Sequence, residues 1–286
     1  MNFCSRASLA AHEHVAGTGV RADAYVFLPV PKRLWHEQEM NGHWASPEEL
    51  QAVRIARKGG VVTRLYNPPD RDHAEGAAAL VYARKDGAPD ALSPLLEPIA
   101  RRWRVDAEGR QRLAICTHGT RDRCCAKFGF AAFQTAKRLH HAGASAFEPL
   151  ECSHLGGDRF AATGIFFPSG GMYAHLDHLD LGAVCAEESA GRLCPIGYRG
   201  RVFDAPLTQL VRAGLARQGL VTEAEVPIAV AERGPLDLVA EVGGQRFRVR
   251  LKQAQEQFFG SCSALSAGRP SRGRRTVFAA AEPLPA

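Results

Sequence analysis

The chain has no apolar stretch that could cross a membrane. A transmembrane helix needs about 20 consecutive, mostly apolar residues, and no run among the 286 residues approaches that length. The first residues, MNFCSRASLAAHEHVAG, also lack the basic segment and the following apolar segment of a secretory signal. We therefore expect a cytoplasmic protein with no membrane partner.

The sequence also has few clusters of positively charged residues, although the net charge is +6 and the isoelectric point is about 9.0. Lys and Arg are scattered, and the one dense cluster is GRPSRGRR, residues 268–275. Its Pro, Gly and Ser content predicts a flexible basic tail. A nucleic-acid partner, which would favour a basic patch or stripe, is therefore not expected. A basic surface would instead attract a redox partner protein with an acidic surface.

Two enzyme signatures are missing. Glycoside hydrolases need two carboxylates that flank the bond, and no independent pair stands out, because Asp122 and Asp158 both lie in loops with other candidate ligands. Thiol oxidoreductases on thioredoxin-like scaffolds usually contain C-x-x-C, and no two of the cysteines have that spacing. Sugar hydrolysis is therefore not expected, and thiol chemistry stays only as an alternative.

Cysteine itself is plentiful. The chain has eight, at positions 4, 116, 124, 125, 152, 185, 194 and 262. A disulfide framework is not expected in a reducing cytosol, and three cysteines within ten residues suit metal or redox chemistry better. Isolated ones such as Cys4 and Cys185 are interpreted as small, buried apolar residues.

The alternation of strand-like and helix-like segments predicts an α/β protein with three regions. The first is an N-terminal α/β region, residues 1–106. A strand is expected at residues 24–30. A helix is expected after Ser46, because Ser46 and Glu49 together form a capping box.

The second predicted region, residues 107–203, has the order strand, helix, strand, hairpin, helix. This is the order of a thioredoxin-like unit, with the hairpin turn expected at residues 168–171. The third region, residues 204–286, begins with an amphipathic helix. Strands follow, two of them joined by a turn at Gly243 and Gly244, and the basic tail ends the chain.

Two loops in the second region contain most of the reactive side chains. They are CTHGTRDRCC, residues 116–125, and ECSHLGGDRF, residues 151–160, and each follows an apolar strand. Because ligand sites in open α/β sheets tend to lie beyond the carboxyl ends of strands, the two loops are expected to meet. Gly156 and Gly157 would let the backbone approach a bulky group closely. Two thiolates with nitrogen or oxygen donors fit either zinc or a [2Fe–2S] cluster.

These motifs resemble the sucrase/ferredoxin-like family. The resemblance rests on CTHGTRD…C, on SHLGGDRF and on YRGR about forty residues later, with FCS and GTG near the start. Relatives include fungal thioredoxin-like ferredoxins with a C-x8-C…H-x-G-G-H signature. The family implies a [2Fe–2S] cluster in a thioredoxin-like domain, with two cysteines on one iron and two histidines on the other. By this resemblance Cys116 and Cys125 are the thiolate ligands and His154 is the first histidine ligand.

Asp158 stands where the family has its second histidine. Either Asp158 is itself the fourth ligand, or a nearby residue takes over, or the site binds iron poorly or not at all. The candidates for a replacement are Cys152, Cys194, His175 and His178.

Around these ligands, a second set of residues is expected to support the site: His118, Arg121, Asp122, Gly156 and Gly157. Arg121 and Asp122 are expected to form an ion pair that holds the loop. His118 either donates a hydrogen bond to a cluster sulfur or stabilises the turn. Cys124, next to Cys125, is expected to be a buried thiol or a substitute ligand.

The sequence thus predicts a [2Fe–2S] electron carrier or redox sensor that exchanges single electrons with a redox partner protein. Two alternatives stay open. One is a thiol oxidoreductase on a thioredoxin-like scaffold, with Cys116 as the attacking thiolate. The other is a structural zinc protein.

Overall fold

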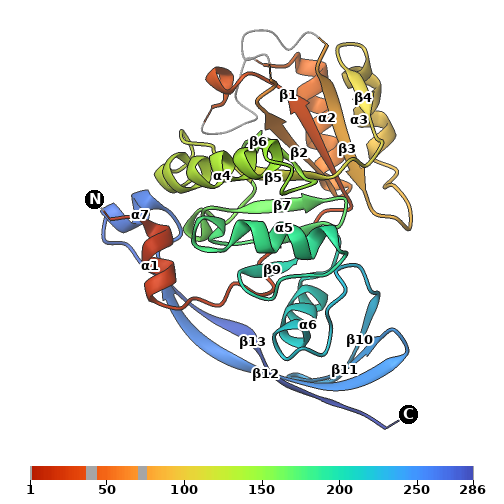
Figure 1. Ribbon diagram of the computed structural model, residues 1–286, viewed down its shortest axis with the longest axis vertical. Helices are drawn as coiled ribbons and strands as arrows, with labels where there is room; N and C mark the ends of the chain where they lie inside the picture. The colour runs from red at the N-terminus through yellow and green to blue at the C-terminus, as the bar shows by residue number, and fades with distance from the viewer. Residues whose placement is uncertain (1, 37–43, 70–75, 286) are drawn as a thin grey trace.

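The computed structural model describes residues 2–36, 44–69 and 76–285. It contains a nine-stranded mixed sheet with strand order β4-β3-β1-β2-β6-β5-β7-β8-β9 and a separate four-stranded antiparallel sheet with order β10-β11-β12-β13. Figure 1 shows the large sheet in the upper part of the molecule and the small sheet below it. The predicted α/β class is confirmed.

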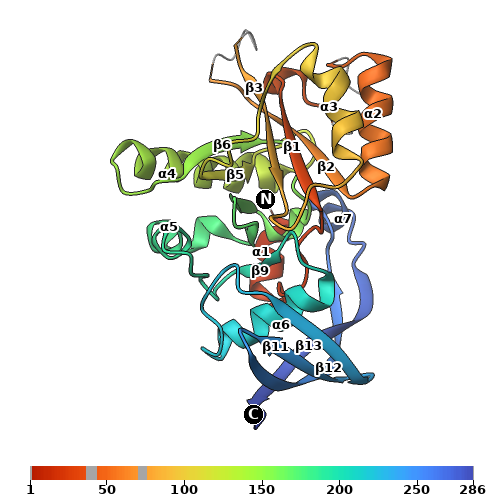
Figure 2. The same cartoon turned by 90° about the vertical axis from the view of Figure 1, so that its right-hand side faces the viewer.

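The N-terminal half of the large sheet contains two strand–helix–strand units. Their elements are β1 (Ala24–Pro29), α2 (Pro47–Lys58), β2 (Val61–Tyr66), β3 (Ala78–Ala83), α3 (Leu92–Ala100) and β4 (Arg104–Asp106). Strand β1 pairs in parallel with β2 and antiparallel with β3. Helix α2 begins at the predicted capping box of Ser46 and Glu49. Figure 2 shows α2 and α3 together on one face of this half.

The second half follows the predicted order of strand, helix, strand, hairpin, helix. Its elements are β5 (Arg112–Cys116), α4 (Phe130–His141), β6 (Glu148–Cys152), β7 (Gly164–Phe167), β8 (Gly171–Tyr173), α5 (Leu181–Ser189) and β9 (Tyr198–Arg201). Strands β5 and β6 are parallel, and β7 and β8 form the hairpin, whose turn lies between Phe167 and Gly171 as predicted. Short helical turns complete it: η3 (Cys125–Gly129), η4 (Asp158–Phe160) and η5 (Leu176–His178).

The two halves meet at the carboxyl ends of their central strands. Strands β2 and β6 pair at Tyr66 and Cys152. Lys32, in the short turn η1 (Lys32–Leu34), extends its ammonium across this junction to the Glu151 carboxylate at 2.6 Å and the Thr117 hydroxyl at 2.8 Å. Polar groups at strand ends therefore join the two halves next to the cysteine and histidine loops. The sheet is continuous across the predicted boundary at residue 106.

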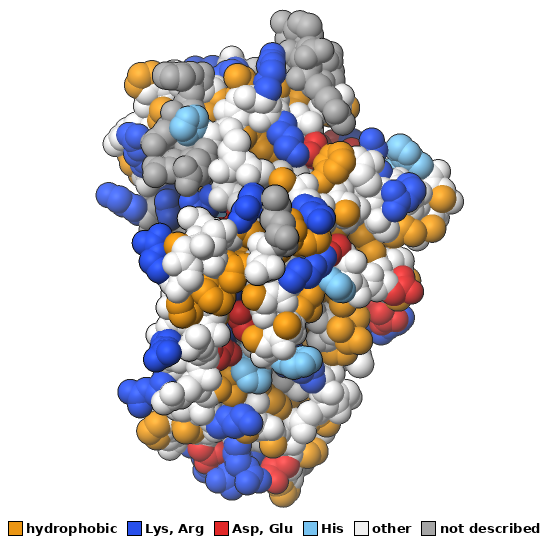
Figure 3. Space-filling view, turned by 90° about the vertical axis from the view of Figure 1, so that its left-hand side faces the viewer, with side chains coloured by type: hydrophobic (Ala, Val, Ile, Leu, Met, Phe, Trp, Pro, Cys, Tyr) orange, Lys and Arg blue, Asp and Glu red, His pale blue; other side chains and the backbone are white. Residues whose placement is uncertain are grey.

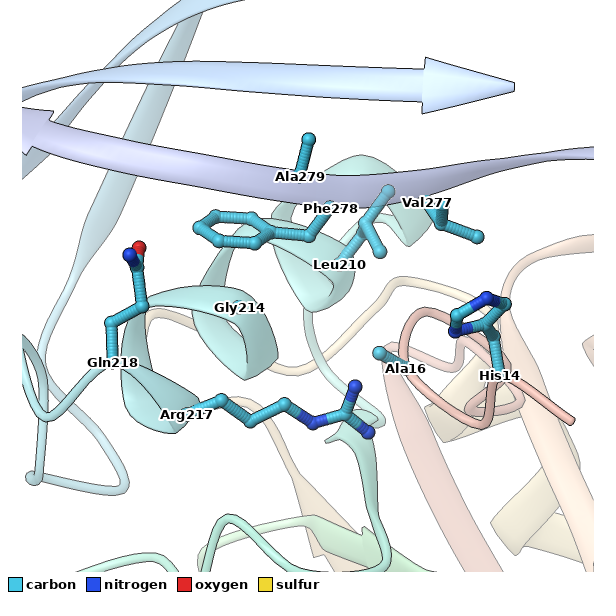
Figure 4. Close-up of a pocket in the computed structure, with 9 residues that line it drawn as sticks. All are labelled: His14, Ala16, Leu210, Gly214, Arg217, Gln218, Val277, Phe278 and Ala279. Carbon is cyan, nitrogen blue, oxygen red and sulfur yellow. The ribbon is translucent and has the colours of Figure 1, made fainter. Parts of the chain in front are cut away.

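The C-terminal region comprises α6 (Pro206–Arg217) and the small sheet. Its strands are β10 (Ile228–Gly234), β11 (Asp237–Val242), β12 (Gln245–Phe258) and β13 (Ser271–Pro283). Gly243 and Gly244 turn β11 into β12 as predicted. Helix α6 packs on β13 so closely that a Cβ on Gly214 would lie 2.0 Å from the ring of Phe278, and Figure 4 shows the two side by side at the edge of a cavity of about 230 Å³.

The prediction of a flexible basic tail at residues 268–275 is wrong. Residues from Ser271 onward belong to β13, which pairs with β12 over most of its length. Composition alone suggested flexibility, but a long neighbouring strand supplies hydrogen-bond partners for this backbone. In Figure 1, β12 and β13 form a long curved hairpin, here called the β12–β13 arm, with α7 (Cys262–Ser266) at its tip beside α1 (Cys4–Ala10).

In the described part of the chain, no helix is both long and apolar enough to cross a membrane.

Candidate metal centre

The first ligand loop begins where β5 ends. Cys116 is the last residue of the strand, and Cys125 opens η3, a single turn of π-helix that leads into α4. Such turns are rare and frequently occur at functional sites. The turn packs tightly against the strand end, because a Cβ on Gly129 would lie 2.0 Å from the carbonyl oxygen of Cys116. Local packing thus brings Cys125 back towards Cys116.

The second loop begins where β6 ends and contains His154 and Asp158. Gly156 and Gly157 have φ angles of 92° and 81°, in the left-handed region that favours glycine. The loop therefore doubles back, and the Nδ1 atom of His154 lies 3.1 Å from Oδ1 of Asp158.

The two loops meet, so Cys116, Cys125, His154 and Asp158 lie together. Sγ of Cys125 is 3.9 Å from Oδ1 of Asp158, and Cys116 is close enough to Cys125 and His154 for each to shift the pKa of the other. Both thiols are 1% exposed. We call these four side chains the ligand group. Two thiols, one imidazole and one carboxylate could together hold a metal or an iron–sulfur cluster.

The protonation equilibria of the ligand group are strongly perturbed. The hydrogen bond from Cys125 holds the pKa of Cys116 well below its usual range, although burial opposes this, and His154 lowers it further. The interaction with Cys116, together with burial, raises the pKa of Cys125 well above its usual range. Burial disfavours a charged imidazole, but the attraction of the Asp158 carboxylate and the Cys116 thiolate outweighs burial and raises the pKa of His154 to about 9. One thiolate beside an imidazolium is therefore the favoured state.

The glycine loop lies directly on Arg199, a buried residue from the YRGR strand β9. A Cβ on Gly157 would lie 2.8 Å from Nη2 of Arg199, and Nη1 donates to the carbonyl of Gly156 at 2.9 Å. The bulky group that Gly157 approaches is therefore this guanidinium, whereas a Cβ on Gly156 would lie 2.6 Å from a methyl group of Val20. Burial lowers the pKa of Arg199 to about 9. Sequence reasoning did not assign Arg199 to the site, although the YRGR motif was the signal that could have identified it.

The predicted ion pair between Arg121 and Asp122 is wrong for the described structure. Nε of Arg121 instead lies 3.7 Å from Oδ2 of Asp158. Asp122 accepts hydrogen bonds from two backbone amides, those of Cys124 at 2.8 Å and Cys262 at 2.7 Å. Two charge-assisted bonds to fixed amides hold the carboxylate more firmly than an exposed, flexible Arg would.

His118 is buried and stabilises the turn through its backbone. Its carbonyl accepts from the amides of Arg121 and Asp122 at 3.1 and 3.2 Å, and its ring meets Trp35 edge-on with centroids 5.7 Å apart. Its backbone also helps to lower the pKa of the Cys116 thiol. A backbone donor next to a thiolate is a means of tuning a bound metal site.

The four candidates for a substitute ligand lie in different places. Cys152 is paired with Cys116 across the neighbouring parallel strands β5 and β6, so it borders the ligand group. Cys194 precedes β9, and its amide donates to the Tyr173 hydroxyl. His175 packs edge-on against Phe160, while burial lowers its pKa to about 4. His178, like His175, lines a cavity beside α1.

A second cluster of thiols, which sequence reasoning missed, lies beside the first. Cys4, Cys124 and Cys262 are all buried, with Sγ atoms 3.5 Å (Cys4–Cys124), 3.2 Å (Cys124–Cys262) and 3.7 Å (Cys4–Cys262) apart. We call them the thiol triad. One carboxylate oxygen of Asp122 lies within 4.8 Å of all three sulfurs, so this buried group could hold a metal ion. Cys4 is buried, as predicted, but it is not isolated, because two other thiols lie within 3.7 Å of its sulfur.

A polar cavity of about 590 Å³ connects the surroundings of the two clusters. It is lined by Asp158 of the ligand group, by Asp122 and Cys262, and by hydroxyl and arginine side chains of the β5 loop and α7. The cavity gives solvent a route to one side of each cluster.

Comparison with known proteins gives the family of the chain. The sucrase/ferredoxin-like family profile matches residues 15–205, more than half of the chain. The protein therefore belongs to the sucrase/ferredoxin-like family, as its motifs predicted. No curated protein and no solved structure matches it significantly. Family membership indicates a redox or metal-binding role.

Proposed function

We propose that this protein is a [2Fe–2S] electron carrier or redox sensor, with Cys116, Cys125, His154 and Asp158 as its cluster ligands. The observation that supports the proposal is the meeting of the two loops. Four potential donors, separated by up to 42 residues in the sequence, converge at the carboxyl ends of two neighbouring parallel strands. This is where an open α/β sheet usually binds its ligand.

The donor set fits the cluster chemically. Thiolates are the usual ligands of iron–sulfur clusters, and imidazole ligands occur on one iron of the histidine-ligated type. Cys116 and Cys125 would hold one iron, and His154 with Asp158 the other. When bound, the cluster supplies reversible uptake of one electron. The chain's own contribution is the glycine loop on Arg199, which positions His154 and Asp158, and the backbone of His118, which helps to keep Cys116 as a thiolate.

Asp158 has two possible roles in such a site. As a ligand, it would place a carboxylate where the family has a histidine. As a carboxylate 3.1 Å from Nδ1 of His154, it would form an ion pair with that imidazole and orient it, a role that carboxylates commonly have beside metal-bound histidines. We propose the ligand role, because Asp158 is also within 3.9 Å of the Cys125 sulfur and thus faces the centre of the group.

The partner we propose is a redox protein with an acidic surface, in a reducing compartment such as the cytoplasm. All eight cysteines are free, which suits such a compartment. On the face shown in Figure 3, Lys and Arg side chains are spread from end to end among apolar and acidic ones. A distributed positive charge accelerates encounter with an acidic protein.

The test is anaerobic purification followed by iron and sulfide analysis and absorption spectroscopy. We expect about two irons and two sulfides per chain and a red-brown protein in the wild type. Cys116→Ser and Cys125→Ser should lose stable cluster binding, whereas Cys185→Ser, which removes a buried thiol on α5, is the matched control and should retain it.

Three results would contradict the proposal. A colourless protein with intact fold and only zinc would favour the structural zinc alternative. A metal-free protein whose Cys116 is selectively alkylated would favour the thiol oxidoreductase. Loss of iron and sulfide in Cys262→Ser, with retention in Cys116→Ser, would place the cluster on the thiol triad instead.

A further inference from the structure

We propose that the thiol triad and Asp122 form a second, separate metal site that binds one Zn²⁺ ion and fastens the tip of the β12–β13 arm to the first ligand loop. The proposal is independent of the [2Fe–2S] cluster. Two of its ligands, Cys4 and Cys262, lie outside the segment that matches the family.

The triad brings together three segments that are remote in the sequence. Cys4 opens α1, Cys124 lies in the loop after β5, and Cys262 opens α7 at the tip of the arm. The sequence separations are 120, 138 and 258 residues. Figure 1 shows α1 and α7 side by side at the end of the long hairpin. Three buried thiols gathered from such distances are hard to explain by apolar packing alone.

The sulfur separations fit a single tetrahedral ion. Four donors at about 2.3 Å from Zn²⁺ are about 3.8 Å apart in a tetrahedral site. The observed separations of 3.2–3.7 Å lie close below that value, so a small outward shift makes room for an ion. A disulfide requires about 2.05 Å and joins only two sulfurs, which would leave the third thiol unused.

Asp122 supplies the fourth donor. It is 5% exposed, and both of its oxygens already accept a backbone amide, one from Cys124 and one from Cys262. Each carboxylate oxygen has a second lone pair, so it can bind an ion while the amides hold it in place. Three thiolates and one carboxylate give the same formal charge as the four-cysteine zinc site, a common structural type.

The ion expected is Zn²⁺ because the donors are mostly soft thiolates in a closed, four-donor arrangement. Its role is structural. Without the ion, two hydrogen bonds join the arm's tip to the loop after β5. The backbone amide of Cys262 donates to the Asp122 carboxylate at 2.7 Å, and Arg123 donates to the Ser266 hydroxyl at 2.8 Å. With the ion bound, Cys124 belongs to the zinc site and the next residue, Cys125, belongs to the ligand group. The ion therefore ties the arm to the loop that contains Cys125 and stabilises that loop.

The test is metal analysis of the full-length wild type, purified anaerobically without affinity metals. We expect about one zinc per chain, bound independently of iron. Cys4→Ser and Cys262→Ser should each lose most of it, and Asp122→Asn should bind it at least about tenfold more weakly. Cys185→Ser is the matched control for removal of a buried thiol. Cys116→Ser should lose iron and keep zinc, which separates this site from the ligand group.

Two measurements do not depend on the folding of variants. Replacement of zinc by Co²⁺ in the wild type should give the absorption of tetrahedral, thiolate-bound cobalt. A zinc chelator should make the arm more susceptible to trypsin at Arg272, which lies just after its tip and is followed by glycine. Wild-type protein without zinc, zinc unchanged in Cys262→Ser, mononuclear iron in place of zinc, or a native disulfide between two triad cysteines would each overturn the proposal.

Discussion

Arg199 donates a hydrogen bond from Nε to the hydroxyl of Thr18 at 2.9 Å, across 181 residues of sequence. Its other two nitrogens donate to the carbonyls of Gly156 and Thr18. One buried guanidinium thus joins the GTG segment, the glycine loop after β6 and strand β9. Three short motifs that are separate in the sequence are parts of one hydrogen-bonded unit, and that unit supports His154 and Asp158.

The first prediction concerns this unit. Arg199→Lys should lower the free energy of unfolding by about 2–4 kcal/mol, because an ammonium cannot replace the planar fork and leaves buried carbonyls without donors. The change should also reduce iron content. Urea unfolding measures the first effect. Arg192→Lys, which alters an exposed pair with Glu187, is the control and should cost less than about 1 kcal/mol. Equal losses in the two variants would mean that Arg199 is not a structural centre.

Local patterns predicted much of the fold. The capping box of Ser46 and Glu49, the turn before Gly171 and the order of strands and helices in the second region all follow from residues close together in the sequence. The meeting of the two ligand loops also followed, because both come after neighbouring parallel strands.

Contacts between remote segments could not be predicted in the same way. Nothing near Cys4 or Cys262 in the sequence indicates that their sulfurs lie 3.7 Å apart. The basic segment at residues 268–275 has a composition typical of disorder, and only its pairing with β12 makes it a strand. The role of Arg199 could not be predicted because it depends on the groups that accept its hydrogen bonds, and these belong to Thr18 and Gly156, far away in the sequence.

The second prediction concerns Glu188 on α5. Burial raises the pKa of Glu188 to about 7, although hydrogen bonds from Tyr173 and Ser169 oppose the shift. The folded state therefore binds this proton more tightly than the unfolded state does, and this group's contribution to stability is lost as pH rises from about 4.5 to about 7.

The measurement is the free energy of unfolding between pH 5 and pH 8. Glu188→Gln should remove a decline of about 2–3 kcal/mol over that range and be the more stable protein at pH 8. Gln keeps the shape and still accepts from Tyr173. The control is Glu187→Gln on the same helix, which is exposed and should leave the decline in place. A decline of the same size in Glu188→Gln would disprove the assignment.

The third prediction concerns His154. A neutral imidazole donates less negative charge to iron than a thiolate does, so histidine-ligated clusters have higher reduction potentials. His154→Cys, in a variant that retains its cluster, should therefore lower the potential. Protein-film voltammetry gives the value. An unchanged potential in a cluster-containing variant would show that His154 does not bind iron.

The last prediction concerns Asp158 and distinguishes its two possible roles. The oxidised cluster core has two positive charges, which two thiolates cancel, so a carboxylate ligand leaves the site with one negative charge. A site with two histidines would be neutral, and one with four thiolates would have two negative charges. If Asp158 is a ligand, the reduction potential of the cluster should therefore lie between those of histidine-ligated and all-cysteine clusters, within the range of roughly −400 to +300 mV that these span. Asp158→His should keep the cluster, raise the potential and add a second proton-linked step to its pH dependence.

The comparison variant is Asp158→Asn, which keeps the size of the side chain and can still accept a hydrogen bond from His154. If Asp158 binds iron, this variant should lose cluster stability or change its spectrum. If Asp158 only orients the imidazole, 3.1 Å away, Asp158→Asn should keep both the spectrum and a potential close to that of the wild type, and Asp158→His should gain no second proton-linked step. In that case Cys152, which borders the group beside Cys116, becomes the fourth ligand to test.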